Sequence, residues 1–258
     1  MANAIHPTAI IEAGAKLGEG VSVGAYAYIG GQARVGARTT VHHHATVDGN
    51  TVLGEACEVF PYAFIGGKTQ DLKYRGGDLG LAIGDRNVFR EFVTVHQSTI
   101  DGTRTTLGHD NYLLAYTHVA HDCTIGNHLI MSNYAGLAGH VQVGDYVTIA
   151  GYAGFHQFCR IGDYAMAGAM SKVTQDIPPY MIAEGNPAEV RLVNRVGLQR
   201  HGFSDTDQAV ARRMFKTLYR EERNRREALA LMDEWPEADH PMVRKLVAFA
   251  RSTQRGLA

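Results

Sequence analysis

The chain has 258 residues, of which 45% are hydrophobic and 20% charged, and its formal net charge is −1. This length and hydrophobic content allow a sizeable core in one or two domains. The near-neutral charge provides no general basic surface, so we expect no nucleic-acid partner. The first residues, MANAIHPTAI, lack the basic region and long hydrophobic run of a signal peptide or membrane span. We therefore expect a cytoplasmic protein without a membrane span.

Hydrophobic residues recur every six positions from Ile5 to Val173, and only Asp71, Gly77 and Asp101 break this register. A second column, four residues after each hydrophobic anchor, holds mainly small or β-branched residues. Glycine often follows the anchor, where we expect a tight turn that glycine tolerates. The pattern is typical of a hexapeptide β-solenoid, in which each hexad forms a short strand and a corner, and three hexads close one coil of eighteen residues.

The repeat is interrupted twice, at 67–82 and at 98–106, and resumes each time in the same phase. Loops that interrupt a solenoid often carry binding groups. We predict a parallel β-helix over residues 1–177 with these two segments as loops.

A different pattern begins after the solenoid, because Pro178 and Pro179 end the strand repeat. We predict a small all-α domain over 178–258, and hence a mainly β protein with a helical end. Its arginine-rich helices fit either a solvated face or a surface for an acidic protein. The first helix is expected at 188–200, and a second should begin after a capping box of Ser204 and Asp207. Two more are expected near 224–235 and at 240–252.

The three cysteines, Cys57, Cys123 and Cys159, all fall on the small inward column. Cys123 and Cys159 are two coils apart, which is roughly 10 Å at the spacing of neighbouring strands and too far for a disulfide. We interpret all three as core residues with no metal or redox role.

The segment THVAHDC, residues 117–123, places two histidines and an aspartate on one predicted coil. Residues eighteen apart stack vertically in such a solenoid, so Gly139 should lie directly above His121. A histidine beside a glycine N–H has the outline of a general base next to an oxyanion donor, which acyl transfer requires. A single histidine on a polar face needs no function, but a cluster favours one. The other groups expected to converge there are His118, Asp122, His140, His156 and Gln157.

A convex prism has no pocket of its own, whereas small-molecule sites are concave. The second wall must come from the 67–82 loop, the helical domain or a neighbouring subunit. Tyr116, Tyr134 and Tyr152 recur at intervals of eighteen, which predicts a stacked aromatic ladder. Such a ladder suits either association with another subunit or simple self-packing.

An ordered set of motifs runs across nearly the whole chain. The motifs are TQDLKY at 69–74, REFVTVH at 90–96, AHDCTIGN at 120–127, LAGHVQV at 137–143, FHQFCRIG at 155–162, QDIPPY at 175–180, EGNPA at 184–188 and GLQRHGFS at 197–204. No single hexad is diagnostic, whereas the ordered set resembles the UDP-N-acetylglucosamine 3-O-acyltransferases, the first acyltransferases of lipid A biosynthesis.

The resemblance implies a homotrimer of left-handed parallel β-helices with active sites between adjacent subunits. It implies transfer of an (R)-3-hydroxyacyl chain from the phosphopantetheine of acyl carrier protein to the 3-hydroxyl of UDP-N-acetylglucosamine, with no bound cofactor or metal. By motif, His121 would be the general base, Asp122 would orient it, and the Gly139 N–H would be the oxyanion donor.

The same resemblance implies a set of substrate contacts. Lys73 and Arg200 suit a diphosphate, and Met166 and Ala169 match positions that limit acyl-chain length. The chain departs from the family pattern at Val196, where an acidic residue is common, and at His201, which replaces a second arginine. The implied substrate-binding residues are Gln70, Asp71, Lys73, His96, His118, His140, His156, Gln157, Asn194 and Arg200.

Three alternatives are weighed against this hypothesis. The related N-acyltransferase of the same pathway is expected to carry an additional N-terminal domain, whereas here the hexads begin at Ile5. A γ-type carbonic anhydrase shares the solenoid and would use His96, His118 and His121 as zinc ligands. A non-catalytic scaffold has no need for a base beside a glycine.

Overall fold

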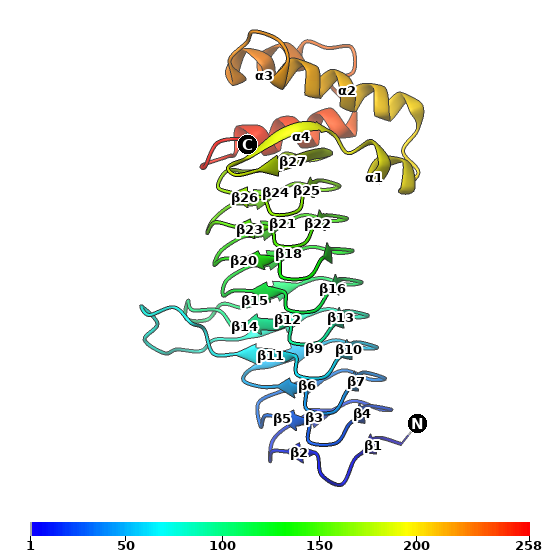
Figure 1. The fold of residues 1–258 in the computed structure, drawn as a ribbon, viewed down its shortest axis with the longest axis vertical. Helices are drawn as coiled ribbons and strands as arrows, with labels where there is room; N and C mark the ends of the chain where they lie inside the picture. The colour runs from blue at the N-terminus through cyan, green and yellow to red at the C-terminus, as the bar shows by residue number, and fades with distance from the viewer. Residues whose placement is uncertain (1) are drawn as a thin grey trace.

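The computed structural model describes residues 2–258 and has the form of a tall prism of short strands with helices at one end (Figure 1). Each strand of the solenoid pairs in parallel with the equivalent strand of the next coil, which produces three long, narrow sheets. The predicted parallel β-solenoid followed by helices is confirmed.

The first sheet runs the length of the prism and ends in a hairpin. In spatial order its strands are β1 (Ala4–Ile5), β4 (Ser22–Val23), β7 (Thr40–Val41), β10 (Glu58–Val59), β13 (Val88–Phe89), β16 (Tyr112–Leu113), β19 (Ile130–Met131), β22 (Thr148–Ile149), β25 (Met166–Ala167), β27 (Met181–Gly185) and β28 (Ala188–Val193).

The other two sheets consist of parallel strands alone. The second contains β2 (Ile10–Ile11), β5 (Tyr28–Ile29), β8 (Thr46–Val47), β11 (Phe64–Gly67), β14 (Thr94–His96), β17 (His118–Val119), β20 (Gly136–Leu137), β23 (Gly154–Phe155) and β26 (Lys172–Val173). The third contains β3 (Lys16–Leu17), β6 (Arg34–Val35), β9 (Thr51–Leu53), β12 (Leu81–Ile83), β15 (Thr105–Leu107), β18 (Thr124–Ile125), β21 (Gln142–Val143) and β24 (Arg160–Ile161).

The hydrophobic anchors fill the interior, as the repeat predicts. Val41 and Val59 are fully buried and pair across neighbouring coils. The cysteines are also buried and unpaired, which confirms that they are core residues. Burial raises the pKa of each thiol, to about 12 for Cys123, so the reactive thiolate is suppressed.

Glycine often follows the hydrophobic anchor for a different reason from the one expected. The left-handed backbone falls two positions later, on residues such as Tyr116 and Asp122, and among the glycines that follow an anchor only Gly66, at the start of the first insertion, has a positive φ within residues 2–258. At Gly18 a Cβ atom would lie 2.5 Å from the backbone nitrogen of Ala37 in the next coil. Close stacking of neighbouring corners therefore excludes a side chain there, and the expected glycine turn is corrected.

Both insertions leave the prism at the corner between the second and third sheets. The first follows β11 and ends at β12, and the second follows β14 and ends at β15. The first projects as the cyan loop at the side of the prism (Figure 1). Ile65 pairs with Val95 and Val95 with Val119, so both loops are accommodated without loss of phase.

The predicted helix at 188–200 is wrong over its first half. Residues Ala188–Val193 form β28, which pairs antiparallel with β27, and only Arg195–Arg200 is helical, as α1. The helix-favouring residues of this segment are overridden because the segment pairs with β27, extends the first sheet by one strand and packs against α2. The solenoid sheet therefore extends beyond residue 177.

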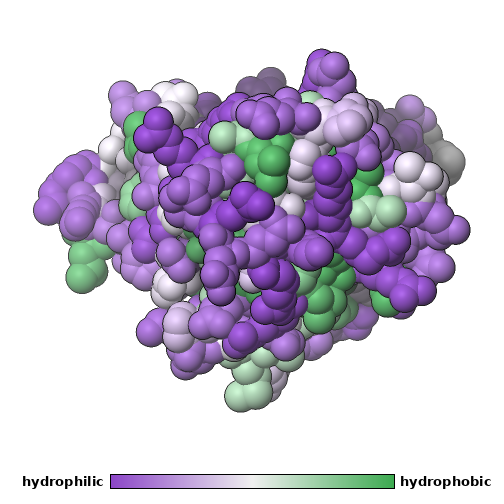
Figure 2. Space-filling model, turned by 90° about the horizontal axis from the view of Figure 1, so that it is seen from above, coloured by the Kyte–Doolittle hydropathy of each residue, from purple (hydrophilic) through white to green (hydrophobic). Residues whose placement is uncertain are grey.

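The remaining helices are α2 (Asp205–Tyr219), α3 (Arg225–Asp233) and α4 (Pro241–Arg251). The capping box of Ser204 and Asp207 is confirmed at the start of α2. Seen from the helical end, the surface is mainly hydrophilic with separate hydrophobic patches (Figure 2), as expected for a cap on an open solenoid end. Part of the arginine charge is used within the chain, since Arg213 pairs with Glu237 and lies over Trp235. Within residues 2–258, no helix has the length and hydrophobicity needed to cross a membrane.

Candidate active site

The polar residues singled out in the sequence meet at one edge of the prism. Between the second and third sheets, residues 120–123, 138–141 and 156–159 form three stacked corners, which together we call the histidine corner. Its vertical register follows from the pairing of His118 with Gly136 and of Gly136 with Gly154. The predicted spacing of eighteen residues per coil is therefore confirmed here.

His121 and Asp122 form the centre of this corner. His121 Nδ1 lies 2.8 Å from Asp122 Oδ2, and the two side chains are 16% and 6% exposed. With the carboxylate ionised, Nδ1 carries the proton and donates it, which leaves Nε2 free to accept one. His140 stands one coil above Asp122, with its Nε2 3.8 Å from the same oxygen.

Asp122 stays charged despite its burial. Burial works to raise the pKa of the carboxyl group, but hydrogen bonds from Thr99 and His121 outweigh burial and hold the pKa below its usual value. The Thr99 hydroxyl donates to Oδ2 at 2.5 Å, and the Thr99 N–H lies 3.1 Å from Oδ1. The site therefore contains a fixed negative charge behind His121.

Gly139 lies against the face of the His121 ring, as predicted. A Cβ atom at this position would fall 2.5 Å from Cε1 and 2.6 Å from Nε2 of His121. The Gly139 N–H makes no hydrogen bond to another residue within 2–258. A free N–H thus lies beside an imidazole; Gly139 itself is buried, and the His121 side chain is partly exposed.

A second pair of histidines extends the cluster along β14 and β17. The rings of His96 and His118 meet edge to face with centroids 4.8 Å apart, and Thr94 Oγ1 is 2.8 Å from His118 Nδ1. Burial lowers the pKa of both, and nearby imidazoles add to the effect; His96 reaches about 4. His96 is therefore neutral at physiological pH.

This buried imidazole predicts acid sensitivity of the fold. An unfolded histidine titrates near 6.5, so protons bind the unfolded chain more tightly than the folded one. Stability should be complete above about pH 6.5 and fall by roughly 3 kcal/mol as the pH is lowered to about 4. Urea unfolding at fixed protein concentration across this range measures the loss.

His96→Phe preserves the ring shape but cannot titrate, so its unfolding free energy should depend less on pH. A smaller dependence should persist, because burial also lowers the pKa of His118 and His140. The matched control, His6→Phe at an exposed position, should behave as the parent protein. Equal acid sensitivity in His96→Phe and the parent would contradict this assignment.

His156 and Gln157 occupy the coil above Gly139 and are exposed within one chain. The Phe158 N–H donates to the Gly139 carbonyl at 3.2 Å, and the Phe158 ring stacks on His140 with centroids 4.5 Å apart. The predicted convergence of these corner residues is therefore present in the structure.

The first loop, residues 68–80, brings a further negative charge near the histidine corner. The Asp71 carboxylate, after that of Asp122, partly opposes the burial that lowers the pKa of His140. Asp71 also accepts a hydrogen bond from the Lys73 backbone N–H at 2.9 Å. The side chains of Gln70 and Lys73 are exposed.

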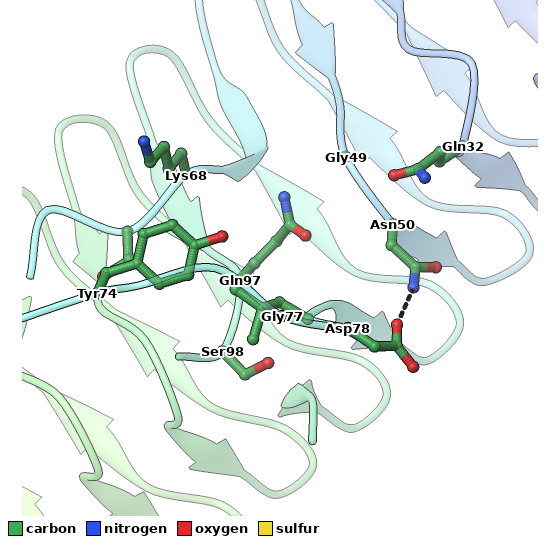
Figure 3. Close-up of a pocket in the computed structure, with 11 residues that line it drawn as sticks. Gln32, Gly49, Asn50, Lys68, Tyr74, Gly77, Asp78, Gln97 and Ser98 are labelled. Carbon is green, nitrogen blue, oxygen red and sulfur yellow. Dashed lines mark hydrogen bonds between the residues drawn. The ribbon is translucent and has the colours of Figure 1, made fainter. Parts of the chain in front are cut away.

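A pocket of about 390 Å³ lies where this loop meets the solenoid (Figure 3). Lys68, Tyr74 and Gln97 surround it, and Asn50 donates to Asp78 across one side at 3.3 Å. The loop thus makes polar contacts with corners one to three coils below His121.

Asn194 and Arg200 are carried by α1, away from this loop. Asn194 caps the helix by accepting from the Gly197 N–H at 3.0 Å, and its amide donates to the Tyr164 carbonyl at 2.8 Å. The side chain of Arg200 is exposed. His201, which departs from the family pattern, packs on Tyr146 and Tyr164.

Met166 and Ala169 lie near a different edge of the prism. Met166 belongs to β25, and Ala169 to the corner that joins the first and second sheets. The aromatic ladder occupies the same edge, where Tyr116, Tyr134 and Tyr152 stack at 4.9 and 4.8 Å, which confirms its prediction. Within one chain, Met166 and Ala169 therefore do not lie beside His121.

Three possible metal ligands lie close together in the histidine corner: His121, Asp122 and His140, with donor atoms within 4.8 Å of one another. Among residues 2–258 this is the one such group, and it differs from the trio of the carbonic anhydrase alternative. Thr99 was not predicted as a site residue. Its only signal in the sequence is its place in the loop at 98–106.

Two family models match the chain. The model described as UDP N-acetylglucosamine O-acyltransferase, domain 2, covers residues 176–258, and the model of the bacterial transferase hexapeptide, six repeats, covers residues 14–49. The two matches fall on the helical end and on the solenoid, respectively.

Relatives match over almost their full length. The acyl-acyl-carrier-protein–UDP-N-acetylglucosamine O-acyltransferases of Saccharophagus degradans and Paraburkholderia phymatum are 44% and 45% identical, with 98% of both chains covered. Among solved structures, LpxA from Acinetobacter baumannii is 38% identical with a TM-score of 0.94, covering 98% of this chain and 99% of that one. The UDP-N-acetylglucosamine acyltransferase of Francisella novicida is 32% identical with the same TM-score, covering 98% and 93%. Sequence, fold and site geometry agree, and the chain belongs to the UDP-N-acetylglucosamine O-acyltransferase family.

Proposed function

We propose that the protein transfers an (R)-3-hydroxyacyl chain from acyl carrier protein to the 3-hydroxyl of UDP-N-acetylglucosamine, the first step of lipid A biosynthesis. The observation that carries this proposal is the His121–Asp122 pair with Gly139 against the imidazole. The names of the relatives with 44% and 45% identity support the substrates.

In the proposed reaction, His121 Nε2 removes the proton from the sugar 3-hydroxyl as the oxygen attacks the thioester carbonyl carbon. The C=O electron pair moves onto the carbonyl oxygen, which receives a hydrogen bond from the Gly139 N–H. When the carbonyl re-forms, the C–S bond breaks, and the departing phosphopantetheine sulfur takes the proton from His121. Asp122 holds the imidazole and stabilises its charged form, as a carboxylate does in other His-based acyl transfers.

The proposed substrate contacts surround this centre. Lys73 and Arg200 would neutralise the diphosphate, and the neutral His96 would hold its neighbour His118 in place. The remaining proposed contacts are Gln70, Asp71, His118, His140, His156, Gln157 and Asn194.

A homotrimer would bring the separate edges together. The aromatic ladder is strongly exposed in one chain, with Tyr116 at 46%, Tyr134 at 49% and Tyr152 at 63%, which is unusual unless a partner covers it. A neighbouring subunit placed on this edge would bring Met166 and Ala169 opposite another subunit's histidine corner. The groove between subunits would then hold the acyl chain.

A product assay tests this function. Purified protein is incubated with a panel of 3-hydroxyacyl and unsubstituted acyl carrier protein thioesters and with UDP-N-acetylglucosamine or its 3-amino analogue. We expect a mass gain of one 3-hydroxyacyl group on UDP-N-acetylglucosamine, and the panel identifies the preferred chain. Absence of acylated UDP-N-acetylglucosamine, or acylation of the 3-amino analogue alone, would overturn the proposal.

If Ala169 lies at the end of the acyl-chain groove, Ala169→Met should shorten the preferred acyl chain by about two to four carbons. The longer side chain would move the end of the groove towards the thioester. One methylene in a fitted pocket changes the rate by about 10- to 200-fold, so the shift should be visible in kcat/KM across the panel. Ala115→Met is the matched control, because residue 115 occupies the same corner position three coils lower. An unchanged length preference in Ala169→Met would count against the proposal that residue 169 limits the length of the acyl chain.

A further inference from the structure

The carboxylate of Asp122 forms hydrogen bonds with Thr99 of the second loop as well as with His121. Asp122 Oδ2 receives the His121 Nδ1–H at 2.8 Å and the Thr99 hydroxyl at 2.5 Å. The Thr99 N–H lies 3.1 and 3.2 Å from the two carboxylate oxygens. The Asp122 backbone N–H donates to the Thr105 hydroxyl at 2.8 Å. Thr99 thus holds the Asp122 carboxylate, and Thr105, at the start of β15, holds its backbone N–H.

The loop that carries Thr99 is itself fixed. The neighbouring Ser98 is fully buried. Its hydroxyl donates to the Thr103 carbonyl at 2.8 Å and accepts from the Gly80 N–H at 3.2 Å. The Ser98 N–H in turn donates to the Gly80 carbonyl at 3.0 Å. The two insertions are therefore joined at Ser98, and Thr99 has little freedom to move.

We infer that Thr99 is a positioning residue, which acts on the proposed acyl transfer by fixing the Asp122 carboxylate behind His121. Without the Thr99 hydroxyl, Oδ2 loses its shortest bond and can turn towards His140 Nε2, now 3.8 Å away. His121 would then lose the partner that holds its proton on Nδ1, and a part of its population would present the wrong nitrogen to the sugar. This inference rests on the proposed function of His121.

The test is Thr99→Val, which retains the branched shape and the backbone N–H but removes the hydroxyl. Loss of one hydrogen bond to a charged group should lower kcat by about 10- to 100-fold, while the KM values of both substrates stay within about twofold, because Thr99 acts through Asp122. Thr99→Ser restores the donor and should recover most of the rate. Thr106→Val, in β15 and with no hydrogen bond to Asp122 among residues 2–258, should match the parent protein.

A double-mutant cycle separates positioning from general damage. If Thr99 acts through the carboxylate, Thr99→Val should have little further effect on kcat in an Asp122→Ala background. Equal losses in both backgrounds, or failure of Thr99→Ser to recover the rate, would overturn the inference.

His121→Ala separates this inference from the proposed function. If His121→Ala is inactive and Thr99→Val is normal, only the positioning role fails. If His121→Ala remains active, the proposed function of His121 fails.

Discussion

Replacement of His121 by alanine is expected to reduce kcat by roughly 100- to 10,000-fold, the range that a general base contributes. The imidazole donates to the Asp122 carboxylate and fills the space beside Gly139. Its loss removes the proton acceptor for the sugar hydroxyl and leaves the oxyanion donor in place. Steady-state rates at saturating acyl carrier protein thioester and UDP-N-acetylglucosamine measure the effect.

The His121→Ala variant should stay folded, because Asp122 keeps its hydrogen bonds from Thr99 and the hydrophobic anchors are unchanged. Circular dichroism and the oligomeric state should therefore match the parent protein, and UDP-N-acetylglucosamine should still bind. The control His128→Ala removes a histidine that stacks on Tyr146 at another corner. Near-normal turnover in His121→Ala, with the control also normal, would refute the assignment of the base.

The meeting of His121 and Gly139 could be predicted from the sequence because a solenoid fixes the register of every coil. Once the hexad phase is known, adding eighteen places Gly139 above His121 and His140 above Asp122, and the structure agrees. The same arithmetic placed the aromatic ladder and the buried cysteines. Short parallel strands leave no freedom to slip, because a shift of one residue would turn the anchors outward.

The arithmetic fails where the chain leaves the repeat. Several side chains of the segment 188–193 favour a helix. The segment nevertheless forms β28, because the edge strand β27 of the first sheet is free to pair with it. The hydrogen bonds of Thr99 and the approach of Asp71 to His140 depend on how two loops fold, which periodicity does not describe. Hexad spacing thus predicts which residues of the stacked corners meet, whereas the contacts made by the two loops depend on the tertiary structure.

Gly139→Ala is expected to lower kcat by about 100- to 1,000-fold, although it adds a single methyl group. The new Cβ would lie 2.5 Å from Cε1 and 2.6 Å from Nε2 of His121, so the ring must move. A displacement on the order of 1 Å in a reacting group can cost about 100-fold, and a disturbed oxyanion donor costs about 100- to 1,000-fold. Gly139 has no left-handed backbone, so strain in the main chain does not contribute.

The matched control is Gly154→Ala, one coil higher, where a Cβ atom would meet no heavy atom within 4 Å. This variant should retain the parental kcat within about twofold, since it has open space and the same ordinary backbone. In a His121→Ala background, Gly139→Ala should add little, because the displaced ring is already absent and alanine keeps its N–H. A large further loss in that background would assign the effect to the backbone donor. A normal rate for Gly139→Ala alone would show that the position of the His121 imidazole against residue 139 does not matter for the reaction.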